Sequence, residues 1–549
     1  MVQQIQHIHS KSSDAGILYA ERFRSQIIRW SWVAFAICAL FQFLLFMDIT
    51  NIVMVACVAM AWLMFTKTFF RPKIIMNYSL SFFMIFAFTS TQFYLPLLFT
   101  TLEGKPLIYN LEMPDQVFLH SFASLIVLTL AHGVYRFLLK IPVKNRFPLL
   151  TKIGFFIPPT HFQLFLMGAV GILAQYYVFF MSPDVGWEVT GSASDKLIQG
   201  LIPFSYAPFF IPFGKLYGNN ERVSKIFIPL LLIFTVALFA VSVGRNSRGA
   251  FMLGFASIGF AYGLGLLLGV FKTRIFTWRN AFIVGISVWL LIGPIADLGT
   301  AMVIVRGDRE DVSAEELLAL TLETFGDKDA IRKRRQEDKS ESFEIDWDER
   351  YLDNIFTARF ANIKFNDMSL VQQAKLGTHE PNMFDRSVDY ILGSLPEPFL
   401  DIFNVDVDKE TVYGMSLGDY LYRIAGGQGY IEGFRTGHFA GTGMTAFGWW
   451  YLLLLGIGII PVFYLFDVFL MKTRDPNSPD QSGNQKIQFS FCVIMGLTSI
   501  FHFLGFESVV SLATFLIRGW IQMVLLYFAV FQFSRLISGW RKVAVRLRF

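Results

Sequence analysis

The sequence predicts an all-α polytopic membrane protein, with about twelve transmembrane helices and one large, mostly helical loop between the ninth and the tenth. Three observations predict this class. Of 549 residues, 54% are hydrophobic and 16% are charged, and the mean hydropathy is +0.49, which excludes an ordinary soluble domain. Apolar runs near the ~20 residues that a helix needs to cross a bilayer recur along the chain. Basic residues concentrate in alternate loops.

Twelve apolar runs are the candidate spans. We divide the chain into residues 1–302 with nine spans, a loop domain of residues 303–443, and residues 444–549 with three spans and a basic tail. The expected spans cover residues 28–47, 50–66, 76–100, 117–138, 160–181, 198–216, 226–244, 249–271, 281–302, 444–470, 487–505 and 509–533.

The charges of the loops predict the orientation. Every second loop and the C-terminal tail are basic, and the positive-inside rule places basic segments in the cytoplasm. Both termini are therefore expected in the cytoplasm and the long loop outside. Residues 303–441 hold 27 of the 42 acidic residues against 16 basic ones, and long translocated loops are exempt from the rule. The three cysteines lie in apolar runs, so we expect no disulfide framework.

A short polar hinge, Arg245-Asn246-Ser247-Arg248, separates the spans 226–244 and 249–271 and falls on the outer side. Arginine keeps its charge and presents a planar fork of donors that matches phosphate geometry. Gly244 and Gly249 flank the hinge and permit a sharp turn. The hinge is therefore either a phosphate clamp or an interfacial turn whose arginines reach lipid headgroups.

Further candidates lie at or near the same face. Arg359 is in the loop, and Arg435 and His438 precede the tenth span. Arg518, inside the last span, either lines a polar cavity or forms an ion pair with Asp297 or Glu507. His438 is either a general base or an interfacial residue that makes one hydrogen bond.

Arginines gathered at the outer face suit an amphiphilic anion, with its charge at headgroup level and its hydrocarbon in the bilayer. A polyprenyl pyrophosphate is one such ligand, and a lipid headgroup is another. No nucleotide-binding motif and no metal-ligand spacing occurs in the sequence. We therefore expect no cofactor, no metal and no nucleic-acid partner.

The hinge GRNSRGAF, the late outer loop and the segment GHFAGTGMTAFGWWY together resemble the O-antigen and exopolysaccharide polymerase (Wzy-type) superfamily, which is related to the O-antigen ligases. The resemblance implies a metal-independent membrane glycosyltransferase in the bacterial cytoplasmic (inner) membrane. It would join undecaprenyl-pyrophosphate-linked repeat units of O-antigen (lipopolysaccharide), capsule or exopolysaccharide at the periplasmic face. Lipid-linked donor and acceptor, membrane lipids and a chain-length-regulating co-polymerase are the implied partners.

The family's loop arginines match Arg245, Arg248 and Arg435, and its polar residue ahead of an aromatic-glycine pair matches His438. Arg359 and Arg518 are candidate pyrophosphate ligands from the expected topology alone. An O-antigen ligase stays open, because both enzymes hold the same donor. A lipid-linked oligosaccharide flippase would spread charge through its spans and carry little mass outside. A membrane O-acyltransferase would need a buried histidine paired with an Asn or Asp and facing a cytoplasmic acyl donor, and His120 and His132 do not make that case.

Overall fold

The computed structural model describes residues 2–139, 147–181, 193–244, 248–272, 277–279, 282, 285–286, 289–290, 293–305, 312, 314–340, 347–354, 357–428, 435–474 and 485–546. Of the described residues, 77% are helical, which confirms the predicted mostly helical class. One two-stranded antiparallel hairpin, β1 (Leu470–Arg474) with β2 (Gln485–Phe489), is an addition that the all-α prediction did not include. Labels with η mark 3-10 or π segments.

Seven apolar helices in the described residues are long enough to cross a membrane, so the chain is a multi-pass membrane protein. They cover Leu18–Leu45 in α1 (Val2–Leu45), Ile49–Thr68 (α2), Ser79–Leu102 (α4, Ser79–Thr89; η1, Ser90–Tyr94; α5, Leu95–Leu102), Pro114–Leu138 (α6), Leu197–Tyr217 (α9, Ala193–Leu201; η5, Ile202–Phe213; α10, Gly214–Tyr217), Trp450–Asp467 (α23) and Ser511–Gly539 (α26, Ser511–Thr514; η10, Phe515–Gly519; α27, Trp520–Arg546).

The remaining expected spans are shorter or broken. Three of them contain the short apolar helices Phe227–Val241, Gly254–Leu267 and Pro294–Ile304. The expected span 160–181 is α8 (His161–Tyr176) followed by η3 (Tyr177–Met181). The expected continuous helix over 487–505 is wrong, because part of β2 and three short helices occupy that range. These are α24 (Phe491–Met495), α25 (Leu497–Phe501) and η9 (Phe503–Gly505).

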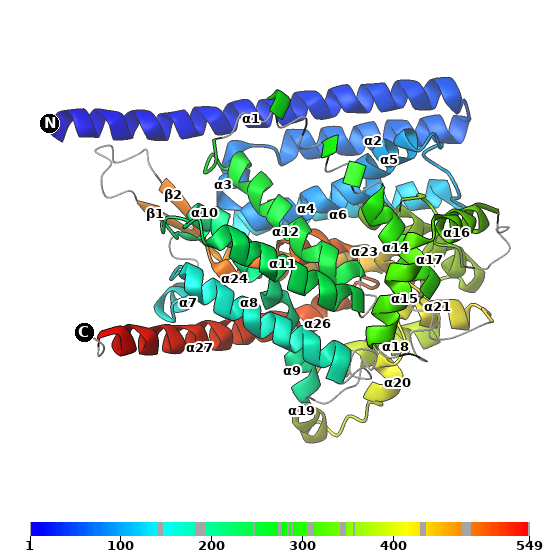
Figure 1. Ribbon diagram of the computed structural model, residues 1–549. Coiled ribbons are helices and arrows are strands. Elements are labelled where there is room, and N and C mark those ends of the chain that lie inside the picture. Colours follow the sequence, from blue (N-terminus) through cyan, green and yellow to red (C-terminus); the bar gives the residue numbers. More distant parts are fainter. Residues whose placement is uncertain are drawn as a thin grey trace.

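Both chain ends and the β1–β2 hairpin lie at one end of the molecule, on the left of Figure 1. The number of membrane crossings stays a prediction. Which side faces the cytoplasm stays a prediction.

The spans pack closely where the sequence allows it. Three prolines lie in the 3-10 segment η5, and two of them, Pro208 and Pro212, are inside it and have no backbone N–H to donate to the preceding turn. Helix α8 lies directly on η5: a Cβ atom added at Gly171 would stand 2.0 Å from the backbone nitrogen of Ser205. Asp467, at the end of α23, accepts hydrogen bonds from the Leu80 amide (3.1 Å) and the Ser81 hydroxyl (2.6 Å), which ties α23 to the start of α4.

The loop domain is helical and lies at the opposite end from the termini (Figure 1). Its first part holds α15 (Ala314–Gly326) and α16 (Lys328–Ser340), and α14 (Pro294–Ile304), at the end of the ninth expected span, comes before it. Its second part holds η7 (Thr357–Phe360), α17 (Ile363–Leu376), α18 (Pro381–Leu392), α19 (Glu397–Ile402), α20 (Lys409–Tyr413), α21 (Leu417–Ile424) and α22 (Phe439–Phe447). The remaining described helices are α3 (Pro72–Asn77), α7 (Pro148–Lys152), α11 (Phe227–Gly244) and α12 (Arg248–Leu267).

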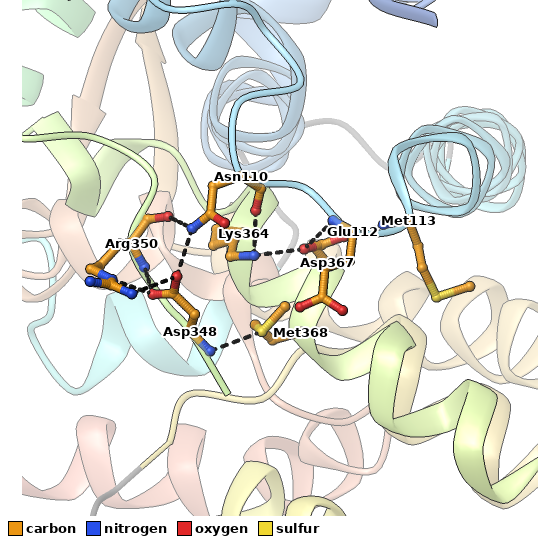
Figure 2. A network of polar contacts seen from close by, with 8 residues as sticks. All are labelled: Asn110, Glu112, Met113, Asp348, Arg350, Lys364, Asp367 and Met368. Carbon is orange, nitrogen blue, oxygen red and sulfur yellow. Dashed lines mark hydrogen bonds and ion pairs between the residues drawn. The ribbon is translucent and has the colours of Figure 1, made fainter. Parts of the chain in front are cut away.

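A buried polar network fixes the loop domain to the membrane helices (Figure 2). Lys364 of α17 donates to the Asp367 carboxylate and to the Asn110 carbonyl. Asp367 in turn accepts the backbone amides of Glu112 and Met113, which precede α6. The carboxylate therefore joins α17 to the loop between α5 and α6.

A second group of contacts in Figure 2 extends this joint. The Asn110 amide donates to the Asp348 carboxylate over 2.8 Å, and Arg350 donates to the same carboxylate. Helix α22 then packs on α17 so closely that a Cβ atom at Gly441 would stand 2.4 Å from the backbone of Ser369. Helix α17, which joins the loop domain to the membrane helices, is thus held in place by buried charge pairs as well as by close helix packing.

Candidate functional site

Arg518 lies inside the apolar span Ser511–Gly539, in the π-helical segment η10 between α26 and α27. Its side chain is partly exposed. No carboxylate of the described residues comes within 4.0 Å of its guanidinium group. A charge in a span is costly unless it meets a partner or a polar surrounding. Arg518 is therefore a candidate ligand for an anion.

One tyrosine of the loop domain, Tyr413, lies near this arginine, and a second, Tyr390, contacts Tyr413. Tyr413 of α20 is close enough for the Arg518 charge to act on its phenol, and burial, the larger effect, raises the pKa of Tyr413 to about 12. The Tyr413 hydroxyl donates to the Tyr390 carbonyl over 2.9 Å, and the two rings are in contact. Since α18 packs against α26, the loop domain borders this part of the last span.

A second arginine comes from α18. Arg386 lies one turn before Tyr390, on the same face of the helix. It is buried, its ring neighbour is Tyr420 at 4.8 Å, and one terminal nitrogen donates to the Thr411 carbonyl over 2.7 Å. Its buried Nε atom has no hydrogen-bond partner in the described part of the chain. Burial lowers the pKa of Arg386, while the nearby Asp389 and Asp408 act in the opposite direction.

Glu507 adds an acidic group to the same region. Burial raises the pKa of Glu507 to about 7, although the amides of Leu417 and Gly418 donate to its carboxylate and work against this rise. The Leu417 contact is 2.8 Å long and caps the start of α21. The charge of Glu507 also acts on Tyr390. A carboxyl group with a pKa near neutrality exchanges a proton readily at physiological pH.

His438 is the N-cap of α22, and its side chain is buried. Its Nδ1 atom accepts the Ala440 amide (3.3 Å), so in the neutral ring the proton sits on Nε2, which faces the Gln92 side-chain amide at 3.3 Å. With that tautomer, the His438 Nε2–H and the Gln92 NH₂ group would be two donors facing one another. The contact is a hydrogen bond when the Gln92 amide is turned so that its oxygen faces His438. Burial lowers the pKa of His438 to about 3. Both ring nitrogens are thus engaged inside the protein.

Arg435 binds a carboxylate of its own domain. Its guanidinium group donates to Asp419 over 3.0 Å and lies 4.1 Å from the centre of the Tyr422 ring. Its backbone amide donates to the same carboxylate. Asp419 and Tyr422 lie one turn apart on α21, so these contacts hold the segment before α22 on that helix.

The other predicted arginines are not brought to this region by any contact of the described residues. Arg359 is exposed on η7, which packs against α5, and its charge acts on His502. Arg245 lies outside the described residues. Arg248 opens α12, and its side chain lies outside the description.

The two carboxylates considered as partners of Arg518 bind elsewhere. Asp297 pairs with Lys328 of α16 over 2.9 Å, and Glu507 caps α21. Sequence reasoning did not select Arg386, Tyr390 or Tyr413. The amphipathic pattern of residues 385–403 was a weak signal for a helix, but it does not distinguish an outward arginine from a buried one.

No protein family, no curated protein and no solved structure matches this chain. The fold and the site thus define a class, a multi-pass helical membrane protein whose loop domain borders an intramembrane arginine.

Proposed function

We propose that this chain is a membrane-embedded glycosyltransferase that polymerises undecaprenyl-pyrophosphate-linked oligosaccharide repeat units at the periplasmic face of the bacterial inner membrane. The observation that supports the proposal most is Arg518, a guanidinium group inside an apolar span with no carboxylate within 4.0 Å among the described residues. An anion whose charge sits at the membrane boundary and whose tail lies in the lipid suits that position.

Arg386 adds a second guanidinium group from the loop domain, linked to the first through the contacting pair Tyr390 and Tyr413. One guanidinium group in the last span and a second in the loop domain would together suit a diphosphate, which offers several acceptor oxygens. The hinge arginines Arg245 and Arg248 remain further predicted ligands.

The proposed reaction is a substitution at the anomeric carbon of the donor. The bond from this carbon to the pyrophosphate oxygen breaks, and the bond to the acceptor hydroxyl oxygen forms. The pyrophosphate leaves on its lipid with the bonding electrons, and arginines stabilise the negative charge that develops. The hydroxyl proton passes to a base. Glu507 and His438 are the candidates for this role: Glu507 has a pKa near 7, and both side chains accept backbone hydrogen bonds inside the protein.

The test uses purified full-length protein in liposomes with lipid-linked repeat units. Wild type is expected to give a ladder of longer lipid-linked products. Arg518→Ala is expected to lose the ladder, and Arg518→Lys to lose most of it, because a point charge does not replace a bidentate fork. Arg332→Ala is the matched control, because Arg332 is exposed and its ion pair with Asp329 lies on the surface. An intact ladder from Arg518→Ala would refute the proposal.

The same assay separates the alternatives. Transfer of one glycan to a second lipid acceptor, without a ladder, would identify a ligase. Movement of intact substrate across the bilayer, without a new covalent product, would identify a flippase. Either result would replace the proposed polymerase.

A further inference from the structure

We propose that the segment Pro396–Asn404 is a membrane anchor that inserts its tip into the outer lipid leaflet. Three of its apolar side chains lie in solvent: Phe399 is 53% exposed, Ile402 is 74% exposed and Phe403 is 71% exposed. They are the most exposed large apolar side chains of the loop domain in the part that the structure describes. Such a cluster marks a binding surface.

The segment is built to hold these side chains outward. Helix α19 begins at Glu397 with a proline in its first turn, and Leu400 alone turns inward to the core. Asn404 adopts a positive φ of 52°, and the Val405 amide returns to the Leu400 carbonyl over 3.0 Å. These bonds end the helix and reverse the chain, so the tip does not depend on a partner for its shape.

Hydrogen bonds also fix the residues on both sides of the segment. The Lys409 ammonium group donates to the Leu395 carbonyl over 2.8 Å, and Asp408 caps α20 by accepting the Thr411 amide over 3.1 Å. Helix α20 packs on α18. The result is a compact surface loop with pinned ends and an apolar tip.

The position of α19 favours lipid as the occupant. In Figure 1, α19 projects at the lower edge of the molecule, just below α9, the helix in which the span Leu197–Tyr217 begins. Leu197 on α9 is itself 52% exposed, as expected of a lipid-facing side chain. An amphipathic element at the boundary of the bilayer buries its apolar face among the acyl chains.

The charges of the segment predict how the anchor binds. Glu397, Asp401 and Asp406 surround the tip, and no basic residue lies between 387 and 408. Attraction to anionic headgroups therefore does not drive insertion, and burial of apolar surface does. We expect insertion to occur in zwitterionic lipid and to be unaffected by salt.

The experiment places a fluorescent NBD label on the tip. Cys38, Cys57 and Cys492 are replaced by alanine, and Ile402→Cys is labelled in full-length protein in zwitterionic nanodiscs, some of which carry nitroxide lipids. Emission is expected to be blue-shifted, quenched by the nitroxide lipids and unchanged by high salt. Asp385→Cys, an exposed position on α18, is the control that should stay red and unquenched. In the labelled protein, Phe399→Ser with Phe403→Ser should remove most of the quenching, while the thermal transition is retained.

Two outcomes would overturn the anchor. Emission at position 402 like that at position 385 would show a tip that stays in water. Blue-shifted emission without quenching by nitroxide lipids would show that protein, such as a second copy of this chain, covers the tip instead. Neither outcome depends on enzymatic activity, so this inference stands or fails separately from the proposed function.

Discussion

The Lys364 ammonium group donates to the Asp367 carboxylate over 2.8 Å, and both side chains are almost completely inaccessible to solvent (Figure 2). The pair lies one turn apart on α17, where Asp367 also binds the chain before α6. Removal of one partner leaves a buried charge without compensation. The joint between the loop domain and the membrane helices therefore depends on this pair.

We expect Lys364→Met to destabilise the protein by about 3–5 kcal/mol, because the Asp367 carboxylate stays buried without its cation. Thermal or denaturant unfolding in detergent measures the loss. Arg332→Ala, which breaks the exposed ion pair with Asp329, should change stability by less than about 1 kcal/mol. Equal effects of the two substitutions would contradict this account of the joint.

Gly171→Ala should cost about 1–3 kcal/mol, because the added methyl group meets the backbone of η5 and forces α8 away. Gly133→Ala on α6 is the matched control, since a Cβ atom there meets nothing within 4 Å. That control should be neutral or slightly stabilising, since alanine favours the helix over glycine. Thermal unfolding of the two variants makes the comparison.

Arg386→Met should keep or raise stability, since it removes a buried charge that no carboxylate within 4.0 Å compensates among the described residues. Under the proposed function it should lower polymer formation by about 10²-fold, the usual cost of one donor to a developing negative charge. Loss of stability together with full activity would assign Arg386 a purely structural role. Product ladders and unfolding curves on the same preparations decide between these results.

Glu507 predicts a pH dependence of stability. Its pKa is about 7 in the folded protein, against 4.5 for a glutamate exposed to water. Because the folded value is the higher one, the folded state holds the proton more tightly. Its contribution to stability is therefore full below about pH 4.5 and is lost as pH rises through about 7. Glu507→Gln should flatten the stability profile between these values, relative to wild type measured in the same detergent.

The buried His438 side chain is expected to give the opposite pH dependence of stability. Its pKa is about 3 when folded, against 6.5 for a histidine exposed to water, so its contribution is full above pH 6.5 and is lost as pH falls toward 3. His438→Asn replaces the capping Nδ1 atom with an oxygen acceptor, and His438→Ala removes the acceptor at a cost of about 1 kcal/mol. Activity retained in His438→Asn but not in His438→Ala would assign His438 to capping. Loss in both variants, with the folded state retained, would assign it to the reaction.

The sequence by itself determined the membrane class and the positions of most long apolar helices. Apolar runs of about twenty residues have one low-energy arrangement in lipid, a helix that satisfies its own backbone groups. The same reasoning overestimated the run 487–505, where Gly496 separates two short helices and part of the run pairs with β1. Hydropathy does not register such breaks, because each piece is still apolar.

The candidate site was predictable only in part. Arg518 was selected from sequence because a charge inside an apolar run is costly wherever the chain folds. Only the tertiary structure decided which charges are already satisfied: Arg435 by Asp419, Asp297 by Lys328, and Glu507 by the start of α21. It likewise placed Arg386 beside Tyr420 and Tyr390. Pairing depends on contacts between residues distant in sequence, and those contacts follow from how the helices pack and not from the local pattern of any one of them.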